Sequence, residues 1–422
     1  MAAVSCTGNN PFLSEWETPY GIPDFSAVQE KHYIPAVEAG IAQQQAEIEA
    51  IVANAEAPTF ANVVEAYEKS GAILDRAVGV LFNLSETDGT DALNAVMEQA
   101  LPMLSSHSDN ITMNPAFFAK VDALYQDIEN LGLNQEQKKA LKKLHNSFVS
   151  NGIALDEASQ ARMREINMEL SSLSNTFGNR LLAENNAFAA EFGVAISEYG
   201  GAMAATADRA LREKMFKAYA SRGNNGNEND TKDLIMKIMA LRIEKANLLG
   251  YKSYAEYVTS EQMAGSPKAV YELLEGIFTQ ANEKAKEELA EMEKMFKRDH
   301  SSATFESWDW WYFAEKVRNQ DYDIKEEEVR EYLSLDNVKG GIFFLCNRLY
   351  GITFRPLKAP LYHPECEVYE VLDSDDTPLG ALYMDFHPRA SKSGGAWCGA
   401  YVEQSYKDGK RVLPVVSIVC NF

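Results

Sequence analysis

Apolar residues recur at helical spacing over most of the chain. A first run ends before Pro58 and comprises Ile34, Val37, Ile41, Ile48, Ile51 and Val52. Thr59 is expected to cap a second helix, whose buried face carries Val63, Tyr67, Leu74, Val78 and Leu81. The strongest break in the pattern is the GNNGNEND segment at residues 223–230, which is expected to be an exposed boundary.

The clearest predicted helix begins at Ser266, the N-cap, with Pro267 in its first turn. It is expected to continue to about Phe296, a length of roughly 45 Å. Its predicted buried stripe consists of Val270, Leu273, Leu274, Ile277, Phe278, Ala281, Leu289 and Met292. A helix of this length suits a protein built around an elongated cleft.

The pattern changes near Asp336, the predicted cap of a helix that ends at Gly351. Residues 366–373 and 379–387 then have the pattern of a β-hairpin. Residues 414–422, PVVSIVCNF, form an apolar, β-branched run typical of a strand covered on both faces. Since no residues of the chain follow to cover that strand, we interpret the chain as truncated.

The expected fold is therefore mainly α, with an elongated multi-helix body and a small α+β region at the C-terminal end. Four divisions are expected: a leader at residues 1–10, an N-terminal helical region at 11–150, a second helical region at 151–335, and the start of an incomplete α+β subdomain at 336–422.

The amino-acid composition and net charge limit the classes of partner that this protein is expected to bind. Hydrophobic residues make up 46% and charged residues 24% of the 422 residues, as in ordinary globular proteins. A net charge of −22 repels nucleic acid and disfavours anionic membrane surfaces, whereas it permits binding of cationic peptides. The sequence contains no transmembrane segment. Its five cysteines form no CxxC pair, so a structural zinc site is not indicated.

The first six residues resemble part of a targeting signal. MAAVSC resembles the end of a bacterial lipoprotein signal, with Cys6 as the acylated residue, although the preceding charged and apolar regions are missing. If Cys6 is a lipobox cysteine, the protein is periplasmic or membrane-anchored; otherwise it is cytoplasmic. The alternative is a leader without function.

One constellation near the C-terminus carries a family resemblance. It comprises Tyr383, Asp385, Pro388, Arg389, Lys392, Ala396, Cys398, Asn421 and Phe422. With segments 9–40, 58–60, 212–223, 308–318 and 350–354, it resembles the zinc metallopeptidases that include thimet oligopeptidase, oligopeptidase A and bacterial peptidyl-dipeptidase. The GAWC sequence at 395–398 favours the peptidyl-dipeptidase branch. His387 departs from the pattern, because the family more often has Tyr or Phe there.

The resemblance implies a gluzincin-like catalytic region that uses one zinc ion and hydrolyses short peptides. It also implies that the helical region at 151–335 forms a wall of the channel that holds the peptide. The zinc ligands and general base of such enzymes lie on an HExxH helix. None of the six histidines here is followed by Glu. We therefore expect zinc to be bound by residues beyond Phe422, no catalytic or metal-binding residue on this chain, and no activity from the chain alone. The complete protein is expected to be a monomer that releases C-terminal dipeptides.

The same resemblance places a substrate cleft at the glycine-rich loop. The candidate cleft residues are Gly394, Gly395, Ala396, Trp397, His387, Arg389 and Asn421. Glycines permit close approach of a ligand, and a strand edge can bind an extended peptide. The alternatives are a plain glycine turn and, for Arg389 and Lys392, pairing with Asp385, which we prefer.

Three further interpretations stay open. The aromatic cluster at 308–313 fits a buried core better than a stacking platform. The family resemblance also allows an endo-acting oligopeptidase, which would release internal fragments. Finally, the chain is compatible with a non-catalytic peptide-binding or scaffold protein derived from a peptidase.

Overall fold

The computed structural model describes residues 10–322, 326–407 and 409–422, so Cys6 lies outside the described residues. Contacts group the chain into two compact units. Unit 1 consists of the chain up to Asn175, Ala240–Gly250 and Phe354–Phe422, and unit 2 of Thr176–Met239 and Tyr251–Thr353. The predicted divisions at residues 150 and 335 separate continuous segments of the chain, whereas each unit combines several segments. The predicted divisions therefore stay predictions.

Helices account for most of the described chain, which confirms the mainly α prediction. They are α1 (Glu30–Ala53), α2 (Ala66–Glu68), α3 (Ala72–Thr87), α4 (Asp91–Thr112), α5 (Pro115–Gln126), α6 (Gln135–Ser150), α7 (Glu157–Phe192), α8 (Tyr199–Ala205), α9 (Arg209–Ala220), α10 (Lys232–Leu248), α11 (Tyr254–Thr259), α12 (Pro267–Asp299), α13 (Trp310–Tyr322), α14 (Glu326–Arg330) and α15 (Leu335–Tyr350). Helices α7 and α10 each contribute residues to both units.

The strands lie in the C-terminal part of the chain, also as predicted. They are β1 (Thr353–Pro356), β2 (Glu367–Leu372), β3 (Pro378–Asp385), β4 (Trp397–Val402), β5 (Ser405–Lys407), β6 (Lys410–Val412) and β7 (Val415–Val419). Five of them form a sheet in the order β1-β2-β3-β7-β4, and β5 pairs with β6. The predicted hairpin is β2–β3, whereas β3 and β7 are parallel neighbours.

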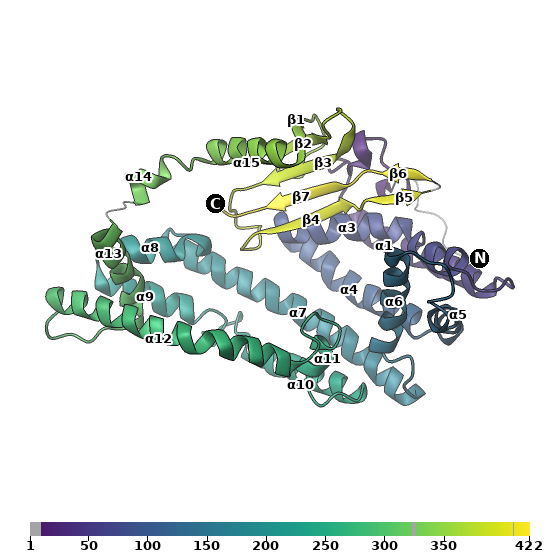
Figure 1. Ribbon diagram of the computed structural model, residues 1–422, viewed down its shortest axis with the longest axis horizontal. Helices are drawn as coiled ribbons and strands as arrows, with labels where there is room; N and C mark the ends of the chain where they lie inside the picture. The colour runs from purple at the N-terminus through teal and green to yellow at the C-terminus, as the bar shows by residue number, and fades with distance from the viewer. Residues whose placement is uncertain (1–9, 323–325, 408) are drawn as a thin grey trace. The chain divides into compact units, whose positions relative to one another are not determined.

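One face of this sheet forms part of the core of unit 1. Tyr383 and Val415 are fully buried there and belong to the same apolar cluster as Phe12 and Tyr33. Helix α3 packs against β4, and α1 packs against both α3 and α4 (Figure 1). The N-terminal helices therefore support the C-terminal sheet from one side.

The terminal strand differs from the expectation. β7 lies inside the sheet, yet among the described residues only one of its faces is fully covered. Val415, Ser417 and Val419 are buried, whereas Ile418 on the other face is 39% exposed. The apolar run reflected pairing with a strand on each edge as well as burial, because β-branched residues suit any pleated, half-buried surface.

Two predicted helix features are also corrected. Thr59 does cap a helical segment, the π-helical turn η3 (Phe60–Glu65), but Gly71, with φ of 80°, separates it from α3. The cap of α15 is Ser334, which accepts from the Asn337 N–H, and not Asp336. The predicted end at Gly351 is confirmed, since Gly351 is left-handed.

Helix α12 has the predicted cap, but most of its predicted buried stripe is exposed. Ser266 accepts from the Ala269 N–H and Pro267 opens the helix. The predicted stripe is buried only near its C-terminal end, where Met292 and Phe296 pack with Phe313. Val270 and Leu289 are half-buried, and the remaining large members are exposed, namely Leu273, Leu274, Ile277 and Phe278. Periodicity established the stripe but not the presence of a neighbour to cover it.

Candidate functional site

The seven predicted cleft residues lie close together in the topology. His387, Arg389, Gly394, Gly395 and Ala396 are on the loop between β3 and β4, Trp397 begins β4, and Asn421 follows β7. Because β7 pairs with both β3 and β4, the two ends of the loop and Asn421 meet at one end of the sheet. His387, Gly394, Gly395 and Ala396 are exposed there.

A buried carboxylate anchors the start of this loop. Asp385 is 0% exposed at the end of β3. Arg389 donates to both its oxygens, from Nη1 to Oδ1 at 2.9 Å and from Nη2 to Oδ2 at 2.6 Å. Lys392 Nζ donates to Oδ1 at 2.9 Å, and the Tyr362 hydroxyl donates to Oδ2 at 2.8 Å. The preferred interpretation of Arg389 and Lys392, pairing with Asp385, is therefore confirmed.

The charge state of Asp385 follows from these contacts. Burial by itself raises its pKa, but the bonds from Arg389, Lys392 and Tyr362 outweigh burial and hold the pKa below its usual value. Burial lowers the pKa of Lys392 despite the attraction of Asp385. Since two cations share one carboxylate, the cluster carries a net positive charge beneath the loop.

The loop is also tied to the C-terminal end of α3. Arg389 Nε donates to the Thr87 carbonyl at 2.9 Å, and Ser393 N donates to the Glu86 carbonyl at 2.8 Å. Between them, the Gly89 N–H donates to the Ser391 carbonyl at 2.9 Å. Carbonyl groups at the end of a helix have no partner within it, and here the loop supplies donors to them.

Asn421 holds the glycine segment from the other side. Its Nδ2 donates to the carbonyls of Gly395 at 2.7 Å and Ser393 at 3.1 Å. Gly395 has φ of +99°, a backbone region that side chains rarely adopt, whereas Gly394 does not. A Cβ at either position would meet no atom within 4 Å. The loop is thus fixed in shape while its outer surface is open to a ligand.

Strand β4 forms one edge of the sheet, next to this loop. Asn83 on α3 donates from Nδ2 to the Ala400 carbonyl at 3.0 Å. A Cβ on Gly399 would lie 2.2 Å from Asn83 Oδ1, so the glycine is required for this close approach. Trp397 Nε1 is buried and has no hydrogen-bond partner in the described part of the chain.

Sequence reasoning missed Tyr362 and Asn83. Tyr362 precedes Asp385 by 23 residues and Asn83 precedes Ala400 by 317, so no local pattern connects them. Only the pairing of β2 with β3 and the packing of α3 on β4 place them at the loop.

The aromatic segment belongs to unit 2 and is mostly core, as preferred. Phe313 is buried, and Trp308, Trp310 and Tyr312 are half-buried, whereas Trp311 is 47% exposed. Beside them, buried Asp309 accepts from Arg212 Nη2 at 2.9 Å and Arg209 Nη2 at 2.8 Å. Two of the segments that carried the resemblance are therefore joined by an ion-pair network.

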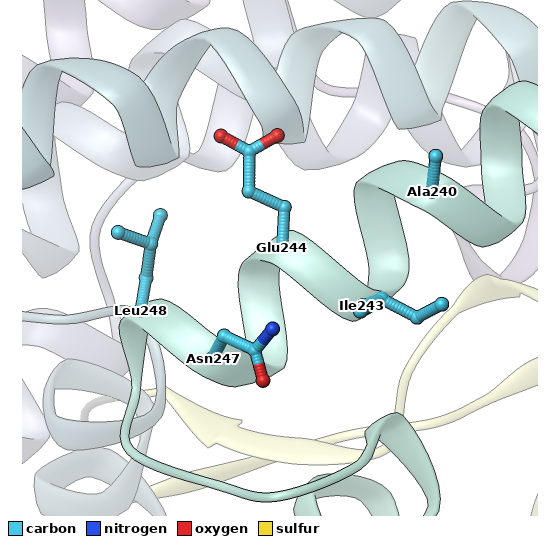
Figure 2. A pocket seen from close by; sticks show the side chains of 5 residues that line it. All are labelled: Ala240, Ile243, Glu244, Asn247 and Leu248. Atoms are coloured by element: carbon cyan, nitrogen blue, oxygen red, sulfur yellow. The ribbon is translucent and has the colours of Figure 1, made fainter.

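A surface hollow of about 380 Å³ lies along one side of α10 (Figure 2). It is lined by Ala240, Ile243, Glu244, Asn247 and Leu248, and by none of the loop residues. Arg162 on α7 engages Glu244, with Nε to Oε1 at 2.6 Å, and holds its pKa below the usual value. Because this carboxylate is already paired, the hollow offers no free reactive group and is not the candidate site.

The described residues hold the loop rigid but bring no reactive set together. Within residues 10–322, 326–407 and 409–422, no three His, Cys, Asp or Glu side chains are grouped so that they could hold a metal ion. The four described cysteines are free. The arrangement is suited to binding a peptide at exposed backbone beside β4.

Comparisons with known proteins agree with the motifs. The profile of Peptidase family M3 matches residues 202–422. The chain is 34% identical to the dipeptidyl carboxypeptidases of Salmonella typhimurium and Escherichia coli, over 98% and 99% of its length. It is 29% identical to the oligopeptidase A of Salmonella typhimurium over 98% of its length.

The chain spans 65% of the Salmonella dipeptidyl carboxypeptidase and 66% of that oligopeptidase A. None of the described helices combines the length and the apolar character needed to cross a lipid bilayer. The profile covers more than half of the chain and includes the whole loop with its Asp385 anchor. The chain belongs to peptidase family M3.

Proposed function

We propose that this chain is part of a zinc-dependent peptidyl-dipeptidase, which hydrolyses short peptides and releases C-terminal dipeptides. The observation that carries the proposal is the match to dipeptidyl carboxypeptidases over nearly the whole chain, at 34% identity against 29% for oligopeptidase A. The GAWC sequence at residues 395–398 supports the same branch.

In this proposal the chain binds and aligns the substrate. An extended peptide pairs with exposed backbone of the loop at Gly394 and Gly395 beside β4. Asp385 and Asn421 act as positioning residues, because their hydrogen bonds fix the loop from beneath and from one side. Exposed His387 and half-buried Trp397 flank the bound peptide.

The zinc ion is assigned to residues outside this chain. When bound, zinc polarises the scissile carbonyl and lowers the pKa of a bound water. The chain by itself is then a substrate-binding part without catalytic power.

The test uses the purified 422-residue chain with added zinc and a set of short peptides. We expect peptide binding by calorimetry and no hydrolysis by mass spectrometry. Hydrolysis by this chain would contradict the assignment of zinc outside it. When the remaining third of an M3 peptidase is supplied, dipeptide products support the proposal and internal fragments indicate an endo-acting oligopeptidase. Binding that persists without hydrolysis even then favours a non-catalytic peptide-binding protein.

The cellular location depends on Cys6. Acylation of Cys6 would anchor the protein to a membrane facing the periplasm, and a free Cys6 would favour the cytoplasm. Mass spectrometry of the N-terminal peptide from the native source distinguishes them, because lipid on the cysteine adds a defined mass.

A further inference from the structure

Exposed apolar side chains are distributed unevenly along the described chain. Of the large hydrophobic residues that are exposed, only Phe82, Val149 and Met168 precede residue 201, and all the others follow it. Single exposed hydrophobics are normal on a protein surface, whereas contiguous ones mark contact sites. Among the described residues, most of the uncovered apolar surface is thus in the part matched by the M3 profile, and only three such residues lie in the N-terminal part.

Helix α15 shows this most clearly. Its apolar stripe consists of Leu335, Val338, Ile342, Leu345 and Leu349, spaced three and four residues apart. No residue of this helix is buried, and Ile342, Leu345 and Leu349 are 42%, 56% and 69% exposed. Alternating steps of three and four residues place these side chains on one face, which is the pattern of a helix that packs along another helix.

The helix has little stability of its own. It has 16 residues, close to the ~12–15 residues below which even alanine-rich helices are marginal in water. Gly340 and Gly341 lie in its interior, where glycine is a poorer helix former than alanine. Helix stability in proteins comes mainly from packing of an amphipathic face. The stripe therefore requires a partner.

We propose that the α15 stripe (Leu335, Val338, Ile342, Leu345 and Leu349) is the docking surface for an amphipathic helix from the third of an M3 peptidase that this chain does not match. The relatives contain that third, since the chain spans only 65–66% of their length. A second copy is disfavoured, because two chains of net charge −22 repel each other. The inference rests on the proposed function only for the identity of the partner.

The test co-expresses the tagged 422-residue chain with the third of Escherichia coli dipeptidyl carboxypeptidase that lies outside its match to this chain. We expect a one-to-one complex by size-exclusion chromatography with light scattering. Leu345→Asp should weaken it by about 100-fold, because it places a charge in an apolar contact. Hydrogen exchange of the α15 amides should slow on binding.

Phe344→Asp is the matched control. Phe344 is adjacent in sequence and 60% exposed, but it lies about 100° around the helix from Leu345 and outside the stripe. Both substitutions are at exposed positions, so the chain alone should keep its circular dichroism and melting temperature. We expect the complex to form with the Phe344→Asp variant and to be lost with the Leu345→Asp variant.

Three results would overturn the docking proposal: no complex with the unsubstituted chain, equal effects of the two substitutions, or a self-dimer that Leu345→Asp abolishes. Peptidase activity is measured separately on the same samples. A complex that depends on Leu345 yet hydrolyses no peptide would confirm the docking surface and count against the proposed function.

Discussion

At the residue scale, Asp385 is the group on which the candidate site depends most. It is fully buried and binds Arg389, Lys392 and Tyr362. Removing one partner of a buried ion pair leaves the others with uncompensated charge. Asp385 is the shared partner of both cations of the motif, and we propose that it shapes the loop rather than contacting substrate.

We predict that Asp385→Asn lowers the free energy of unfolding by about 3–5 kcal/mol, because Arg389 and Lys392 lose their shared counter-charge. Urea unfolding followed by circular dichroism measures it. Glu403→Gln, which changes an exposed carboxylate, serves as the control and should have little effect. Equal stability of the two variants would contradict the role assigned to Asp385.

The lowered pKa of Asp385 also predicts that the free energy of unfolding depends on pH. The pKa of Asp385 is lower in the folded chain than the usual ~3.9 of an unfolded Asp, so its contribution is fully present above about pH 5. It is lost as the pH falls below 4 toward the folded pKa. The stability difference between the unsubstituted chain and Asp385→Asn should therefore shrink between pH 5 and pH 3. A difference that stays constant over this range would exclude the mechanism.

At the element scale, the glycine loop combines a fixed backbone with an open surface. We predict that Gly395→Ala destabilises the protein by about 1–2 kcal/mol, because φ of +99° strains any residue with a Cβ. Gly394→Ala is the matched control, since its φ is not in that region and space is equally open. Thermal unfolding of both variants measures the difference. An effect at Gly394 as large as at Gly395 would show that backbone strain is not the cause.

Helix α12 offers a second element-scale test. Leu274 and Phe278 are 54% and 65% exposed, so the folded chain should bind the hydrophobic dye ANS. The double substitution Leu274→Asp and Phe278→Asp should reduce dye fluorescence without changing helix content. Val149→Asp, at an isolated exposed position, is the control. Unchanged fluorescence in the double variant would mean that this face is covered in solution.

At the scale of the whole molecule, the chain has a loop held by hydrogen bonds and uncovered apolar faces, and it spans 65% of the Salmonella dipeptidyl carboxypeptidase. Since zinc is proposed to be held outside the chain, EDTA should leave the melting temperature of the 422-residue protein unchanged. Differential scanning calorimetry with and without EDTA tests this. A fall in melting temperature on chelation, reversed by zinc, would place a metal site on this chain.

The sequence by itself determined the mainly helical character of the chain, the strands near its C-terminal end and the family to which it belongs. Helical periodicity, the Ser266 cap and Gly351 specified local structure, because these signals act over one turn of helix. The Tyr383-to-Phe422 motif identified the loop, and the proximity of Asp385 to Arg389 and Lys392 along the chain made their pairing foreseeable.

The tertiary structure decided which faces are covered. Leu273, Leu274, Ile277 and Phe278 have the pattern of buried residues and are exposed, because burial depends on a neighbour that periodicity does not identify. The order β3-β7-β4 placed Asn421 against Gly395, and α3 placed Asn83 against β4. These contacts join residues up to 317 positions apart, so packing alone establishes them.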